Sequence, residues 1–163
     1  MANERKHMGS SYTNINIHLI FHIKNTSPTM KEEDLFRIFQ YMGGLVRALS
    51  AHAYKIGGRP DHVHILSSLP TVLSLSDFVR KIKSNSSKWI KEIGAEYKDF
   101  SWQEGYGAFS VSESNKDAVA HYIEQQKEHH YERSAQDEYF LFLSRNGYFY
   151  DSQTGNIIKR DSQ

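Results

Sequence analysis

The sequence predicts an α+β fold of the ferredoxin-like or RRM-like kind, with an antiparallel sheet, helices on one face and a C-terminal helical tail. Segments with the two-residue period of strands alternate with two long segments of helical period, in the order β-α-β-β-α-β. The chain has 163 residues, the size of one compact domain, so we expect a single core. The sheet face opposite these helices is expected to be available for function.

The predicted strands are short and separated by turn residues. Alternation of apolar and polar side chains predicts a first strand over residues 12–24. Residues 53–56 and 62–69 are strand-like and flank a Gly-Gly-Arg-Pro turn at 57–60, which predicts an antiparallel hairpin. A further strand is expected over residues 105–111.

Three segments have helical period. Apolar residues at three- and four-residue spacing predict a helix over residues 31–52 and another from Ser74 to Ile93. A third helix should open near Ser114 and run through Gln126. The polar tail beyond it is expected to be mostly helical, with Gly147 placed to end its helix.

Composition excludes several classes of protein. The chain has no cysteine, which rules out disulfides, a thiolate nucleophile and a cysteine-ligated zinc site. No apolar stretch has the length of a membrane span and the N-terminus is polar, so a cytoplasmic location without membrane attachment is expected. The net charge is only +1, so DNA binding would require a local basic face.

Two histidines on the predicted strand at 62–69 are candidate metal ligands. Strand geometry sends His62 and His64 to one face and Val63 to the other. Two adjacent neutral imidazoles can coordinate one divalent ion. The alternative is that both are ordinary hydrogen-bonded residues on a solvated strand face.

Tyr122 and Gln126 lie one turn apart on the predicted third helix. Tyr122 could belong to the core, but Gln126 falls within the apolar stripe, where an unpartnered amide costs roughly 1 to 3 kcal/mol. A metal ion would satisfy its oxygen, and an incomplete shell of two nitrogens and one oxygen leaves positions for water and phosphate. Such an ion would polarise a phosphate that the Tyr122 phenol attacks.

The helix predicted from Ser74 to Ile93 has a polar, basic side, which is either a solvated surface or a site of phosphate contacts. Its candidate DNA-binding residues are Arg80, Lys81, Lys83, Ser84, Ser87, Lys88 and Lys91. Weaker candidates for base stacking are Tyr54, Trp102 and Tyr106, and for assistance to the site His129 and His130.

Together these residues resemble those of a known family, the HUH-type single-tyrosine transposases of the smallest bacterial insertion sequences. The resemblance spans nearly the whole chain. The matching segments are Tyr12 to His22, Pro60 to Leu66, Lys83 to Ser87, Trp102 to Tyr106 and Tyr122 to Gln126.

The resemblance implies roles for four residues. Tyr122 would be the nucleophile, and His62, His64 and Gln126 would hold Mg²⁺ or Mn²⁺. It also implies single-stranded DNA substrates with hairpins, a 5′-phosphotyrosine intermediate, a free 3′-hydroxyl, and a homodimer that shares active sites between subunits. The expected organisation is a flexible leader over residues 1–11, the transposase domain over 12–133, and a C-terminal helix and tail over 134–163 that packs on it.

Four alternatives remain open from the sequence. A domesticated or non-catalytic nucleic-acid-binding relative would carry the same motifs. An RNA-recognition module shares the fold but would place stacking rings where His62 and His64 stand. A histidine-triad nucleotide hydrolase would need a third histidine where Leu66 stands, and a plain metal-binding protein leaves Tyr122 and Gln126 unexplained.

Overall fold

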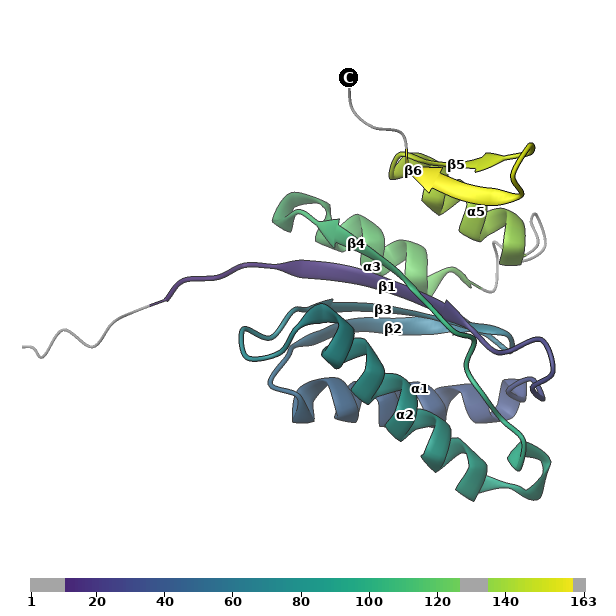
Figure 1. Cartoon of the computed structure of the whole chain (residues 1–163). Coiled ribbons are helices and arrows are strands. Elements are labelled where there is room, and N and C mark those ends of the chain that lie inside the picture. The colour runs from purple at the N-terminus through teal and green to yellow at the C-terminus, as the bar shows by residue number, and fades with distance from the viewer. Residues whose placement is uncertain (1–10, 127–134, 160–163) are drawn as a thin grey trace, which may run out of the picture.

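A four-stranded antiparallel sheet forms the centre of the computed structural model, which describes residues 11–126 and 135–159 (Figure 1). The strands are β1 (Asn16–His22), β2 (Ala53–Arg59), β3 (His62–Ser68) and β4 (Gly107–Val111). Their order across the sheet is β2-β3-β1-β4, and each neighbouring pair is antiparallel. The two long helices lie where the ferredoxin-like prediction puts them, so the predicted fold class is confirmed.

The main hydrophobic core lies between the sheet and helices α1 (Leu35–Ala48) and α2 (Leu75–Ile93) (Figure 1). A short 3₁₀ turn, η1 (Glu32–Asp34), precedes α1, and another, η2 (Ala95–Tyr97), follows α2. The core residues from the sheet are Leu19, Phe21, Val63 and Ile65, and those from the helices include Ile38, Met42, Val46, Phe78, Ile82 and Ile90. All ten are at most 1% exposed, which fixes which sheet face points inward.

Two further helices lie against the opposite sheet face, which the sequence analysis left available (Figure 1). The 3₁₀ turn η3 (Glu113–Asn115) leads into α3 (Lys116–Glu124), whose Ile123 packs on β3 and β4. Helix α5 (Ala135–Arg145) packs through Leu143 on Ile20 and Phe109. Functional side chains on this face are therefore partly enclosed.

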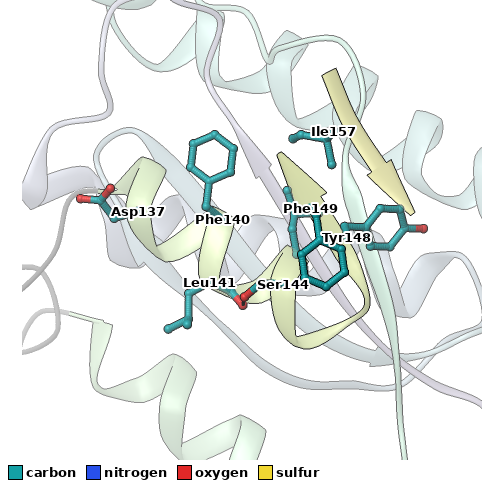
Figure 2. Close-up of a pocket in the computed structure, with 8 residues that line it drawn as sticks. Asp137, Phe140, Leu141, Ser144, Tyr148, Phe149 and Ile157 are labelled. Carbon is teal, nitrogen blue, oxygen red and sulfur yellow. Dashed lines mark hydrogen bonds between the residues drawn. The ribbon is translucent and has the colours of Figure 1, made fainter. Parts of the chain in front are cut away.

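The C-terminal part of the chain is less helical than predicted. Helix α5 ends at Arg145, and Gly147 follows with φ of 80°, as expected of a helix-ending glycine. The chain then forms a two-stranded sheet, β5 (Tyr148–Asp151) and β6 (Asn156–Lys159). A mainly apolar cavity of about 620 Å³ lies between α5 and this hairpin, with Phe140, Phe149 and Ile157 among its lining residues (Figure 2).

The predicted turn at residues 57–60 was wrong at its first three residues. Strand β2 continues through Gly57 and Gly58 to Arg59, and the turn consists of Pro60 and Asp61. Glycine is needed at position 57 because a Cβ there would lie 2.8 Å from the Ile123 carbonyl oxygen. Gly57 thus allows α3 to approach β2 closely.

The first strand and first helix are shorter than predicted, at Asn16–His22 and Leu35–Ala48. Within the described ranges, no helix is both long and apolar enough to cross a membrane.

We expect Ser86→Ala to destabilise the fold. Ser86 is fully buried, and its hydroxyl accepts a hydrogen bond of 2.9 Å from the Trp102 indole nitrogen. The substitution leaves this buried N–H without its partner, at a cost of about 1 to 3 kcal/mol in the free energy of unfolding. Urea denaturation measures the loss, and Ser84→Ala on the exposed side of α2 is the matched control. Equal stabilities of the two variants would contradict this expectation.

Candidate active site

Four histidines gather on the sheet face that α3 and α5 cover. His18 and His22 lie on β1, His62 and His64 on β3, and the antiparallel register pairs His22 with His62. Because side chains alternate along a strand, these imidazoles point away from the α1–α2 core. The ring centroids of His62 and His64 are 5.1 Å apart, and those of His22 and His62 are 5.3 Å apart.

His62 is oriented by its neighbour Asp61. Its Nδ1 atom lies 2.7 Å from a carboxylate oxygen of Asp61, and this hydrogen bond lowers the pKa of the Asp61 carboxyl. A carboxylate accepts, so His62 donates from Nδ1 and its Nε2 atom carries the lone pair. That Nε2 atom lies 3.0 Å from the side-chain oxygen of Gln126.

Gln126 reaches both candidate ligand histidines. Its side chain is 3% exposed, its oxygen lies 3.0 Å from Nε2 of His62, and it lies close enough to His64 to raise the pKa of that imidazole. The helix predicted to run through Gln126 is interrupted: α3 ends at Glu124, Gln125 forms a turn with φ of −87° and ψ of 15°, and Gln126 is helical again.

His64 and His18 form a buried pair. The Nδ1 atom of His64 lies 2.9 Å from the Nε2 atom of His18, and each residue is 1% exposed. Burial lowers the pKa of His64 well below its usual value, and burial also lowers the pKa of His18 to about 3. Both imidazoles are therefore neutral at physiological pH, the form in which histidine binds metal ions.

His62, His64 and Gln126 are the side chains here that could together hold a divalent ion. Adjacent ligands of an octahedral ion with bond lengths of about 2.1 Å lie about 3.0 Å apart, and the His62 nitrogen and Gln126 oxygen are separated by 3.0 Å. Among residues 11–126 and 135–159, no three His, Cys, Asp or Glu side chains form a ready metal cluster. An ion held by two imidazoles and one amide would need water or phosphate to complete its shell.

Tyr122 lies beside these residues in the same chain. Its ring centroid is 5.9 Å from that of His64 and 5.4 Å from that of Phe142 on α5. The side chain is half-buried and lines a cavity of about 360 Å³ together with His18 and Arg145. The phenol is thus accessible from this cavity rather than sealed in the core.

A second cavity approaches the site from the end of β1. It measures about 540 Å³ and is lined by His22, Asp61, Lys24, Gln103 and Tyr139, among others. Sequence analysis missed His18 and His22 as members of this site. The sequence places both on one face of the first predicted strand, but only the pairing of β1 with β3 brings them next to His62 and His64.

The candidate DNA-binding residues of α2 fall into two groups. Arg80, Ser84, Lys88 and Lys91 are exposed, and Lys81 is partly exposed. Lys83 instead donates to the carbonyl oxygens of Gln103 and Gly105, at 2.6 and 2.8 Å, and the Ser87 hydroxyl donates to that of Phe100 at 3.4 Å. Lys83 and Ser87 thus hold the segment before β4 in place.

The candidate base-stacking residues lie in different environments. Trp102 is 7% exposed and belongs to the main core, while Tyr106 packs against that core. Tyr54 packs near Tyr122 and lies under the Lys116 ammonium, which is 4.4 Å from the ring centre. His129 and His130 lie outside the described residues.

Comparison with protein families identifies the class to which this fold and site belong. A family model described as "Transposase IS200 like" matches residues 11–126, which include all four strands of the central sheet and both His62 and Gln126. The chain belongs to the IS200-like transposase family, which confirms the resemblance seen in the sequence. It is a transposase of this family.

Solved structures share the fold. A candidate transposase from Deinococcus radiodurans R1 superposes with a TM-score of 0.56 at 21% sequence identity, over 73% of this chain and 96% of that one. A REP-associated tyrosine transposase bound to a REP hairpin gives a TM-score of 0.54 at 15% identity, over 74% of each chain. No curated protein shows significant similarity to this chain.

We expect the protein to lose stability as the pH falls from 7 to 5, and His18→Phe to flatten this dependence. The depressed pKa of His18 means that it takes up a proton only on unfolding, so acidification below the ordinary histidine pKa of about 6.5 favours the unfolded chain. One histidine that stays neutral in the folded protein lowers the free energy of unfolding by about 2 kcal/mol between pH 7 and pH 5. Chemical denaturation at several pH values measures it. An equally steep profile in the variant would show that His18 is not the group responsible.

Proposed function

We propose that this transposase cleaves and rejoins hairpin-bearing single-stranded DNA through a covalent bond to Tyr122, with His62, His64 and Gln126 holding Mg²⁺ or Mn²⁺. The observation that carries the proposal is the convergence of these residues. The Gln126 oxygen lies 3.0 Å from His62, Gln126 also raises the pKa of His64, and the Tyr122 ring centroid is 5.9 Å from that of His64. The pair Tyr122 and Gln126 is about sixty residues from the two histidines in the sequence.

In the proposed reaction the Tyr122 oxygen attacks the scissile phosphorus. A bond forms between the phenolic oxygen and phosphorus, the bond from phosphorus to the 3′-oxygen breaks, and that oxygen takes up a proton to leave as a 3′-hydroxyl. The phenolic proton is lost to solvent or a nearby base. Rejoining reverses these steps, since a 3′-hydroxyl attacks the 5′-phosphotyrosine and releases the phenol.

The divalent ion, when bound, would polarise the scissile phosphate and so stabilise the charge that develops on it. The protein's part is to hold the ligands in position. Asp61 orients His62 from Nδ1, and burial keeps His64 neutral. Tyrosine has an ordinary pKa near 10, so an activated phosphate compensates for the scarcity of phenolate at neutral pH.

The positions of the basic residues suggest a path for the DNA. The exposed side of α2 belongs to the helix layer on one side of the sheet, whereas the histidines and Tyr122 lie on the other. The segment that Lys83 holds connects the two sides, because Gln103 also lines the cavity at His22 and Asp61. The single strand next to a hairpin bound on α2 would therefore pass Lys24 and Gln103 to reach the site.

A hairpin substrate and a homodimer are the remaining parts of the proposal. The solved REP-associated transposase with this fold is bound to a REP hairpin, which supports a hairpin substrate for this chain. All four site residues meet within one chain, so cleavage by Tyr122 beside its own His64 is sterically reasonable. A homodimer that shares active sites remains a prediction.

We expect Tyr122→Phe to abolish covalent attachment to DNA. Full-length protein is incubated with 5′- or 3′-labelled hairpin-bearing single strands and Mn²⁺, and the adduct is detected by denaturing gel electrophoresis. The matched control is Tyr41→Phe on α1, which keeps the aromatic ring whose centroid lies 4.2 Å from that of Trp89. This variant should form the adduct normally. Because the bond is to a 5′-phosphate, the adduct should contain the fragment on the 3′ side of the cleavage position, and so the label of the 3′-labelled strand. EDTA should prevent formation of the adduct.

Adduct formation by the Tyr122→Phe protein would refute the nucleophile assignment. Hairpin binding by the wild type with no cleavage under any metal condition would instead identify the chain as a non-catalytic relative.

We expect the double substitution Lys88→Ala and Lys91→Ala to weaken hairpin binding and reduce its salt dependence. Two lost phosphate contacts should decrease the slope of log affinity against log salt by about two. Fluorescence anisotropy over a salt series measures both effects. Arg47→Ala on the last turn of α1 removes an exposed cation elsewhere and serves as the control. An unchanged slope in the double variant would exclude this side of α2 from the DNA interface.

A further inference from the structure

His18 is a buried polar residue to which the proposed reaction gives no role. It is 1% exposed, and its Nε2 atom lies 2.9 Å from Nδ1 of His64. The Phe142 ring from α5 meets the His18 ring edge-on, with centroids 4.8 Å apart, and restricts its orientation. The contact between the two imidazoles is thus built into the packing of β1, β3 and α5.

A hydrogen bond between two neutral imidazole nitrogens contains one proton, so one ring donates and the other accepts. If His18 donates, His64 accepts at Nδ1 and carries its own proton at Nε2, where it cannot coordinate a cation. If His64 donates from Nδ1, its Nε2 atom presents the lone pair that a cation requires. The role of His18 in this contact therefore decides whether His64 can be a ligand.

We propose that His18 is a positioning residue that accepts the Nδ1–H of His64 and thereby holds His64 in its metal-binding tautomer. The inference rests on the proposed function, because it takes His64 as a ligand. A parallel contact exists at His62, where the Asp61 carboxylate accepts the Nδ1–H at 2.7 Å. Each ligand imidazole then has its own acceptor, a carboxylate for one and a neutral imidazole for the other.

The surroundings of His18 allow it to act as the acceptor. Its other ring nitrogen, Nδ1, has no hydrogen-bond partner among the described residues, so no protein group there fixes the tautomer of His18. The contact with His64 and the ion therefore determine it. Acceptance at Nε2 places the His18 proton on Nδ1, where no described residue directs a donor that would oppose it.

The test measures Mn²⁺ binding to the full-length protein without DNA, by calorimetry and by the electron paramagnetic resonance signal of free Mn²⁺. His18→Phe retains a ring of similar size but has no acceptor, and His18→Gln restores an acceptor near the position of Nε2. His52→Phe removes an exposed histidine just before β2 and is the control. Circular dichroism and melting temperature in EDTA establish that each variant is folded.

We expect His18→Phe to weaken Mn²⁺ binding roughly 10- to 100-fold, the usual effect of removing a group that orients a metal ligand. His18→Gln should recover most of the affinity, and His52→Phe should match the wild type. Wild-type affinity in folded His18→Phe protein would overturn the inference, and so would equal losses in the Phe and Gln variants. Failure of the wild type to bind Mn²⁺ would instead refute the metal site of the proposed function.

A second measurement needs no substitution. Long-range ¹H–¹⁵N correlation spectra of the wild type saturated with Mg²⁺ distinguish the two ring nitrogens of each histidine. We expect the His64 proton on Nδ1 and the His18 proton on Nδ1. A His64 proton on Nε2 in the Mg²⁺-bound protein would overturn the assignment of His18 as the acceptor.

Discussion

The antiparallel register between β1 and β3 is the constraint on which both the core and the site depend. It places Leu19 and Phe21 beside Val63 and Ile65 under α1 and α2, and it places His22 opposite His62 on the other face. Because side chains alternate, a slip of one residue would drive imidazoles into the hydrophobic core and aliphatic side chains out of it. The free energy gained by burying the core therefore also keeps the histidines together.

Much of this could be predicted from the sequence, because periodicity is a local property. The two long helices, the strand carrying His62 and His64, and the basic side of α2 each follow from patterns within about twenty residues. The pairing of strands is not local, and for that reason His18 and His22 were missed. The glycines at 57 and 58 suggested a turn, because the close approach of Ile123 to Gly57 comes from a distant helix and could not be seen in the local sequence.

Gln126 was singled out from the sequence for a position on the Tyr122 helix that it does not have. Its position four residues after Tyr122 suggested one helical face, yet α3 ends at Glu124 and the amide reaches His62 from beyond the helix. The buried position of an amide was the reliable indication, since a polar group in an apolar environment requires a partner. The proposed nucleophile therefore lies in α3, whereas the proposed ligand lies two residues beyond its end.

Helix α5 lies outside the family-matched range, yet its Phe142 touches His18, His64 and Tyr122. The motif residues therefore do not by themselves define the surroundings of Tyr122. A substitution of Phe142 would change the packing around the tyrosine and two of the histidines while every residue of the matched range stayed the same.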